Sequence, residues 1–128
     1  MYERKLEKEI LCPLEYGLDI FGGKWKSRIV CVLASRGTLR YSALRSELGN
    51  ITDAVLAAML KEMISDDIVD RRQYEEIPPR VEYSLTGKGR SVLPILQSIC
   101  LWSGEHAPSG VERLLPACKT CEHHRNTQ

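Results

Sequence analysis

Apolar residues recur at helical spacing through the first half of the chain, and this pattern predicts four helices. Cys12-Pro13 starts the first, because proline is tolerated at the first helical position, and Gly22-Gly23 ends it. Gly37 ends the second, whose wide apolar stripe indicates that it is largely buried. Thr52 caps the fourth by accepting a hydrogen bond from its first-turn amides. The four predicted ranges are 13–21, 24–36, 42–48 and 53–65.

The apolar period then changes from helical spacing to two, which is typical of strands. The alternation predicts a two-stranded hairpin over 68–74 and 81–85. Pro78-Pro79 lies in the connecting loop and favours a stiff, extended tip, because each proline ring fixes φ. Residues 38–40 are long enough only for a single extended bridge.

The last apolar stripe predicts a long helix that Thr86 caps. Its apolar arc is wider than one packing partner needs. Pro94 lies inside this helix and predicts a kink where its ring meets the carbonyl of Arg90. After Gly104 the composition shifts to proline, serine, glycine and charged residues. We therefore expect one domain over 1–105 and a loosely ordered extension over 106–128.

The predicted order is helix, helix, bridge, helix, helix, hairpin and helix. This is the order of a winged helix-turn-helix with flanking helices, so the predicted fold class is α+β and mostly helical. In such a fold the helix over 53–65 lies in a major groove of DNA, and the hairpin forms a wing along the DNA backbone.

The distribution of charge agrees with this arrangement. The net charge is only +1, but residues 22–50 carry six basic side chains against one acidic, a local charge of +5. A local excess of cations attracts a polyanion even when the whole protein is nearly neutral. An ordinary solvated face is the alternative explanation. The arginines expected to bind DNA phosphates are Arg40, Arg45, Arg71, Arg72 and Arg80.

Composition narrows the class of protein further. The chain has 128 residues, 43% hydrophobic and 27% charged, which is the balance of one foldable domain. Its longest apolar run, 54–60, is seven residues, whereas a membrane-spanning helix needs about 20. The opening MYERKLEKE is charged where a secretory signal is apolar. We therefore expect a cytoplasmic protein with no membrane partner.

Three ordered motifs resemble the HxlR family of bacterial and archaeal regulators, which are relatives of the MarR group. They are CPLEYGLDIFGGKW, LRYSALRSEL and PPRVEYSLTGKG, the last followed by a helix that contains Leu-Pro. The resemblance covers residues 9–105. It implies a homodimer that binds double-stranded DNA and regulates transcription, as a repressor by the habit of the family. It also implies a dimer contact between the first and last helices, through Leu14, Leu18, Val92, Ile95, Leu96, Ile99 and Trp102.

The outward face of the helix over 53–65 departs from the family pattern, which usually has polar or basic side chains there. This face carries Asp53, Ala54, Ala57, Ala58, Lys61 and Glu62. All but Glu62, together with Thr52, are candidate DNA-contacting residues. Alanine can touch a thymine methyl group but cannot make the paired hydrogen bonds that identify guanine or adenine. Base readout is therefore expected to be sparse. Two explanations fit this face. Either specificity comes mainly from DNA shape, the wing and Thr52, or the alanines allow the backbone of this helix to approach the DNA unusually closely. For Asp53 we favour a helix-dipole role over a base contact.

Cys12 stands at a helix start, where unpaired amides and the helix dipole favour a reactive thiolate. In several HxlR-like proteins the cysteine at this Cys-Pro position senses oxidants or electrophiles, so the resemblance makes Cys12 the candidate redox sensor. A small residue packed at a helix end is the alternative. Cys31 is expected in the core. Cys100 is expected in the core or, less favoured, as a partner thiol.

A cysteine and histidine cluster lies near the end of the chain. Cys118, Cys121, His123 and His124 have the ligand types of a zinc site. A second, separated pair of ligands is missing from the sequence, so we favour a loose, solvated tail over metal binding and expect no cofactor.

The sequence also argues against an enzyme. All three histidines lie at or beyond the end of the expected domain, and neither a phosphate-binding glycine loop nor a Ser-His-acid arrangement is recognisable. A winged-helix protein-interaction module without DNA binding is one alternative. A CxxC thiol oxidoreductase is a more remote one, because that motif normally opens a helix in a βαβ unit.

Overall fold

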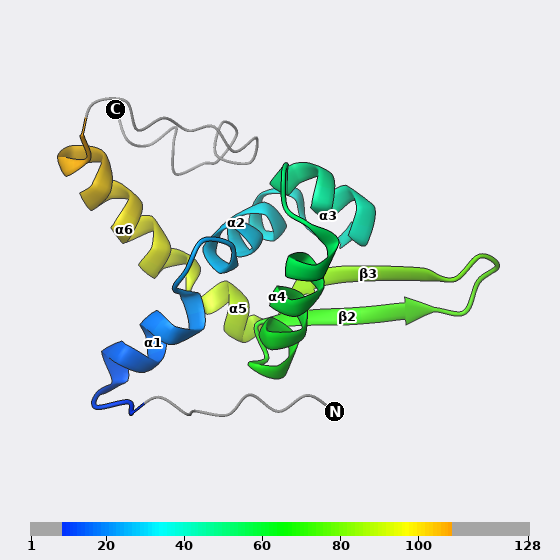
Figure 1. Cartoon of the computed structure of the whole chain (residues 1–128), viewed down its shortest axis with the longest axis horizontal. Coiled ribbons are helices and arrows are strands. Elements are labelled where there is room, and N and C mark those ends of the chain that lie inside the picture. The colour runs from blue at the N-terminus through cyan, green and yellow to red at the C-terminus, as the bar shows by residue number, and fades with distance from the viewer. Residues whose placement is uncertain (1–8, 109–128) are drawn as a thin grey trace.

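The computed structural model describes residues 9–108, and its elements follow the predicted order (Figure 1). Helix boundaries agree with the sequence to within a few residues, and the helix over Asp53–Ser65 has the predicted bounds. The elements are α1 (Pro13–Phe21), α2 (Lys26–Arg36), β1 (Leu39–Arg40), α3 (Tyr41–Leu48), α4 (Asp53–Ser65), β2 (Val69–Tyr74), β3 (Arg80–Leu85), α5 (Gly87–Ser91) and α6 (Leu93–His106).

Three antiparallel strands form a small sheet in the order β1-β3-β2. In the hairpin Val69 pairs with Leu85 and Tyr74 pairs with Arg80, so β2 and β3 are in register along their whole length. The bridge β1 pairs Leu39 with Tyr83, which attaches the start of α3 to the base of the hairpin. The far end of the hairpin extends beyond the helices (Figure 1). The α+β winged-helix fold class is therefore confirmed.

The core gathers side chains from all the central elements around α2. Ile29, Val30 and Val32 of α2 are fully buried, as are Leu44 of α3 and Leu56 of α4. Burying an aliphatic side chain of this size stabilises a fold by about 1.5–3 kcal/mol relative to exposure. This packing fixes α3 and α4 against the sheet.

The C-terminal helix is not the single long helix that the sequence predicted. It breaks at Val92 into the short α5 and the longer α6, and Pro94 lies in the first turn of α6. A proline is tolerated in a first turn, where its missing N–H has no helical partner to lose. Gly89 and Val92 are both buried, which fixes α5 on the protein body before α6 leaves it. The expected kink is thus a complete break.

Helices α1 and α6 project from the side of the molecule opposite the hairpin tip (Figure 1). Both contact α2 at their inner ends. Within residues 9–108 every helix is too short or too polar to span a bilayer.

Candidate nucleic-acid interface

Helices α3 and α4 form a helix-turn-helix whose connecting turn is fixed from inside. Leu48 and Ile51, at either side of the turn, are only 3% and 2% exposed. Gly49 has a φ of 85°, a left-handed conformation that glycine adopts without a Cβ penalty. Thr52 then caps α4, accepting from the Val55 amide at 3.2 Å as predicted.

The predicted groove face of α4 is exposed along the helix. The exposed residues are Asp53, Ala54, Ala57, Ala58 and Lys61. Glu62, at the edge of this face, instead turns toward the protein body and pairs with Lys26 of α2, Nζ to Oε1 at 3.1 Å. The surface that α4 offers is therefore narrow, small and mostly apolar.

A polar network at the start of α4 joins it to α3. The Tyr41 hydroxyl donates to Asp53 Oδ1 at 3.1 Å, and Arg45 Nε approaches the same oxygen at 3.4 Å. Arg45 Nε also lies 3.4 Å from the Ile51 carbonyl oxygen. Burial raises the pKa of Tyr41, and its hydrogen bond to the Asp53 carboxylate raises it further, while Arg45 opposes the shift. Sequence reasoning missed Tyr41, because nothing local links it to Asp53.

The arginines of the wing differ from one another. Arg71 and Arg72 are exposed on β2, and neither makes an ion pair within residues 9–108. Arg80 on β3 pairs with Glu76 at 2.9 Å and Glu82 at 3.8 Å, and its guanidinium carbon lies 4.0 Å from the centre of the Tyr74 ring. Of the wing arginines, Arg71 and Arg72 are therefore the more accessible to a phosphate.

A family model described as HxlR-like helix-turn-helix matches residues 20–110, which include the whole of α2 to α6. The chain belongs to this HxlR-like family. The predicted family is thereby confirmed. Membership of a family of helix-turn-helix regulators implies DNA binding and transcription regulation. The comparisons indicate no catalytic family.

Individual relatives support the assignment to the HxlR-like family. An uncharacterized HTH-type transcriptional regulator of Methanothermobacter thermautotrophicus is 42% identical over 112 residues, covering 80% of this chain and 85% of that protein. The redox regulator HypR in its oxidised form shares 37% identity at a TM-score of 0.68, over 76% of this chain and 99% of that one. The reduced form of the transcriptional regulator YodB from Bacillus subtilis shares 29% identity at a TM-score of 0.71, over 80% of this chain and 100% of that one.

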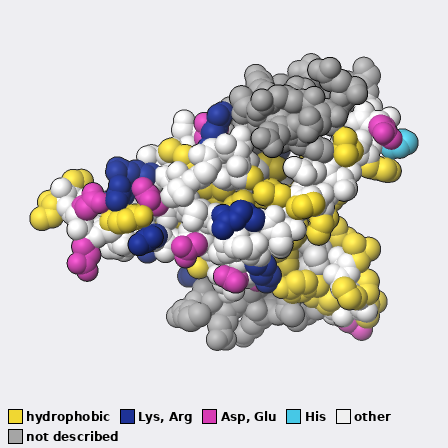
Figure 2. Space-filling view, turned by 180° about the vertical axis from the view of Figure 1, so that it is seen from behind, with side chains coloured by type: hydrophobic (Ala, Val, Ile, Leu, Met, Phe, Trp, Pro, Cys, Tyr) yellow, Lys and Arg dark blue, Asp and Glu magenta, His cyan; other side chains and the backbone are white. Residues whose placement is uncertain are grey.

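This HxlR-like protein also carries an apolar surface on α1 and α6. Hydrophobic side chains gather where these two helices project (Figure 2). The exposed fractions are 69% for Leu14, 58% for Leu18, 60% for Ile95, 51% for Ile99 and 64% for Trp102. We call these five residues the α1/α6 face. All five were expected at the dimer contact. The other two residues expected there, Val92 and Leu96, are not part of this face.

The two exceptions belong partly or wholly to the core. Val92 is 5% exposed and packs inside the protomer, because it lies at the break between α5 and α6. Leu96 is partly buried against the same core. Val92 is therefore corrected from a surface residue to a core residue, and Leu96 contributes only part of its side chain to the surface.

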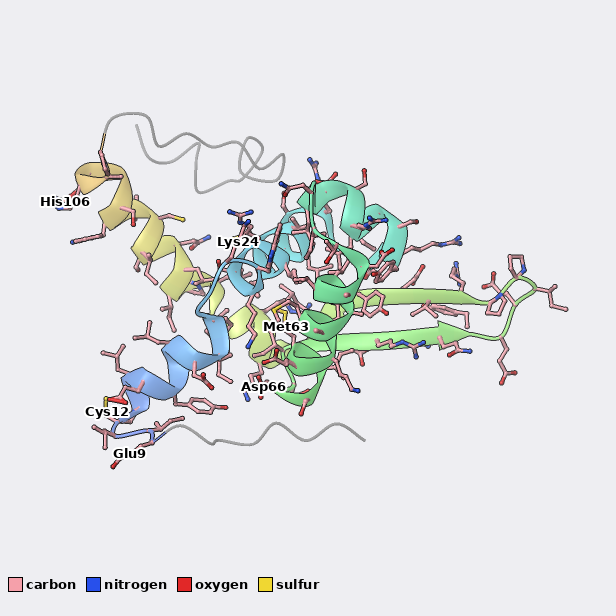
Figure 3. The ribbon with its side chains drawn as sticks, viewed as in Figure 1. Glu9, Cys12, Lys24, Met63, Asp66 and His106 are labelled. Atoms are coloured by element: carbon pink, nitrogen blue, oxygen red, sulfur yellow. The ribbon has the colours of Figure 1, made fainter. Side chains whose placement is uncertain are left out.

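Cys12 lies at the outer end of α1, away from the hairpin (Figure 3). Its Sγ lies 3.9 Å from Glu15 Oε2, and Glu15 Oε1 accepts from the Leu11 amide at 3.3 Å. The thiol is exposed, but a carboxylate already stands at this helix terminus. This negative charge lies three residues from Cys12, and the expectation from the helix amides and the helix dipole left it out.

The other cysteines differ from the expectation of core positions. Cys31 is half-buried, and Cys100 is exposed on α6. The favoured prediction that Cys100 lies in the core is therefore wrong. Cys118, Cys121, His123 and His124 lie outside the described residues. Between residues 9 and 108, His, Cys, Asp and Glu side chains do not form a group of three or more that could hold a metal ion.

Proposed function

We propose that two copies of this chain form a homodimer that binds one double-stranded DNA and represses transcription. The observation that carries the proposal is the separation of two surfaces. The exposed face of α4 and the wing lie away from the projecting α1 and α6, which carry the apolar face (Figure 1). One region is thus suited to a polyanion and the other to a second copy.

DNA binding would place α4 in the major groove and the wing on the adjacent backbone. Arg40, Arg71 and Arg72 are exposed and would contact phosphates. The two half-sites would lie about one helical turn apart, near 10 bp, or a multiple of that spacing. The operator would then be close to palindromic. Residues 1–105 would form the DNA-binding and dimerisation domain, with 106–128 as an extension.

The experiment that tests this proposal is selection of bound sequences from random duplex DNA at a stated salt concentration. Recovery of a nearly palindromic site supports dimeric, sequence-specific binding. Retention of no duplex would favour the protein-interaction module instead, and equal retention of all duplexes would contradict sequence-specific binding. Reporter transcription with and without the protein on the recovered site then tests repression.

We also propose that Cys12 makes DNA binding sensitive to oxidants. HypR is named a redox regulator, and it has been solved in oxidised and reduced forms. Here Cys12 and Cys100 are both exposed; Cys12 immediately precedes α1, and Cys100 lies on α6. In a dimer that buries this face, Cys12 would form a disulfide with Cys100 of the partner subunit. Two thiols lose two protons and two electrons, and an azo oxidant such as diamide accepts them as its N=N bond is reduced to a hydrazine.

Diamide treatment tests the redox proposal. The native protein is expected to form a covalent dimer on a non-reducing gel and to change its DNA affinity, whereas Cys12→Ser does neither. Cys31→Ser is the matched control, because this thiol is half-buried and lies outside the α1/α6 face. An identical response of the native protein and Cys12→Ser would remove Cys12 from the mechanism.

A further inference from the structure

The groove face of α4 contains only one side chain that combines high exposure with a hydrogen-bonding group at the helix N-terminus. Asp53 is the first residue of α4, and its side chain is 68% exposed. N-terminal residues of a recognition helix are those that reach base edges in the major groove. The alanines that follow it along the helix cannot make hydrogen bonds to bases.

The geometry around Asp53 separates the roles of its two carboxylate oxygens. Oδ1 accepts from the Tyr41 hydroxyl at 3.1 Å and faces Arg45 Nε at 3.4 Å. Within the described part of the chain, Oδ2 makes no hydrogen bond or ion pair. The side chain is therefore held in position through one oxygen, and the other oxygen is available to a ligand.

Arg45 also makes it possible for this carboxylate to approach DNA. An unpaired negative charge would be repelled by the phosphates, whereas a carboxylate beside a guanidinium is partly neutralised. The hydrogen bond from Arg45 to Ile51 and its ion pair with Asp53 both use Nε. Its two terminal nitrogens are thus suited to a neighbouring phosphate, in the forked geometry that arginine favours.

We propose that Asp53 is a specificity-determining residue that accepts, through Oδ2, a hydrogen bond from the N4 amine of a cytosine in each half-site, with Arg45 as its positioning residue. The inference rests on the proposed insertion of α4 into the major groove. In that groove cytosine presents a donor with no adjacent acceptor, whereas adenine places N7 beside its amine, and guanine and thymine present acceptors that repel a carboxylate. Cytosine is the base that this chemistry selects.

The proposal is tested by measuring affinity for duplexes that carry each base pair in turn at every half-site position, at one fixed salt concentration. The native protein is expected to prefer cytosine at one position by about tenfold. Asp53→Asn is expected to lose that preference, because the amide group in place of Oδ2 donates a hydrogen bond and cannot accept one from the cytosine N4 amine. The amide oxygen still accepts from Tyr41, so the α3–α4 junction keeps this hydrogen bond.

Asp70→Asn is the matched control. Asp70 is exposed on the wing and makes no ion pair in the part of the chain that the structure describes, so its substitution removes the same charge near DNA. This variant is expected to keep the cytosine preference and to bind all duplexes slightly more tightly. If Asp53→Asn behaves as Asp70→Asn does, or keeps every base preference, the proposal is wrong.

A second test alters the DNA alone. Methylation of cytosine at N4 replaces the amine hydrogen that faces the major groove while guanine pairing is retained. The native protein is expected to lose about tenfold in affinity on that duplex, and Asp53→Ala is expected to bind the methylated and unmethylated duplexes equally. Equal binding of both duplexes by the native protein would overturn the proposal. Failure of the native protein to bind any duplex would instead overturn the proposed function.

The positioning role of Arg45 has its own readout. Arg45→Ala leaves the Asp53 carboxylate unpaired and is expected to weaken DNA binding more than tenfold. Adding Asp53→Asn to Arg45→Ala is expected to recover part of that loss, because the unpaired charge is removed. Strictly additive effects of the two substitutions would show that Arg45 acts on DNA without acting through Asp53.

Discussion

At the scale of single residues, the structure separates cations that look alike in the sequence. Lys26 is only 6% exposed and pairs with Glu62, 36 residues further along the chain. Arg80 is held by two carboxylates and an aromatic ring, whereas Arg71 makes no ion pair within residues 9–108. Charge counting along the sequence gives all three the same weight. Their availability to DNA differs because only folding brings their partners to them.

This difference predicts unequal roles for the wing arginines in DNA binding. Arg71→Ala is expected to lower the slope of log affinity against log salt by about 1, because one phosphate contact is lost. Arg80→Ala is expected to change the slope less, since Glu76 and Glu82 already neutralise Arg80. Filter binding or fluorescence anisotropy between 50 and 200 mM salt, roughly the range over which phosphate contacts are resolved, measures both slopes. Equal slopes for the two variants would contradict the assignment.

Tyr41 predicts a dependence of stability on pH. Its pKa is raised in the folded protein, chiefly by burial and then by the hydrogen bond to Asp53. The folded state therefore keeps this proton at a pH where the unfolded chain, with a tyrosine pKa of about 10, releases it. The stabilisation that protonated Tyr41 contributes is fully present below about pH 10, and it is lost as pH rises through the pKa of Tyr41 in the folded protein.

The measurement compares urea unfolding of the native protein and Tyr41→Phe at a series of pH values. Above about pH 10 the native protein is expected to lose stability more steeply than the variant, in which this group cannot ionise. Parallel pH profiles for the two proteins would show that Tyr41 does not carry the effect.

At the scale of elements, the short helix α5 connects the wing to α6. Thr86 Oγ1 donates to the Asp67 carbonyl at 2.6 Å and accepts from the Gly89 amide at 2.9 Å. Gly89 packs so closely on the backbone of Ile68 that a Cβ atom would clash with the Ile68 carbonyl oxygen. This close approach fixes the direction in which α6 leaves the body.

Two glycine substitutions within α5 test the close approach. Gly89→Ala is expected to destabilise the protein by about 1–3 kcal/mol, because the rigid backbone of Ile68 must move. Gly87→Ala is the control, since a Cβ there meets nothing within 4 Å; alanine is expected to be neutral or stabilising by about 0.4–1 kcal/mol. Chemical denaturation measures both. Equal unfolding free energies for the two variants would contradict the packing argument.

At the scale of the whole molecule, the α1/α6 face is the feature that the isolated chain leaves unexplained. Its five side chains are each more than half exposed, and they stand on two helices that project from the body. Exposed apolar surface of this kind marks an interface between proteins. A second copy of the chain would cover it and would set the distance between the two α4 helices.

The proposed dimer predicts a charge-sensitive interface. Ile99→Glu places a carboxylate in that interface and is expected to convert the dimer to monomer, because burying an unpaired charge costs several kcal/mol. Its DNA affinity is expected to fall, since each half-site would be bound alone. Ile77→Glu is the control for oligomeric state, because Ile77 is fully exposed at the wing tip. Sedimentation velocity distinguishes the species, and a dimeric Ile99→Glu would contradict the interface.

The sequence by itself determined the order of the elements, the cap at Thr52, the stop at Gly37 and the family. These features depend on spacing and on backbone chemistry within one or two turns, which a local pattern records. Tertiary structure alone decided that Val92 is core, that Cys100 is exposed and that the last helix breaks. It also decided that Tyr41 and Arg45 both contact the carboxylate of Asp53. Each of these depends on which distant segment packs against a residue, and burial and ion pairing exist only after the chain has brought those segments together.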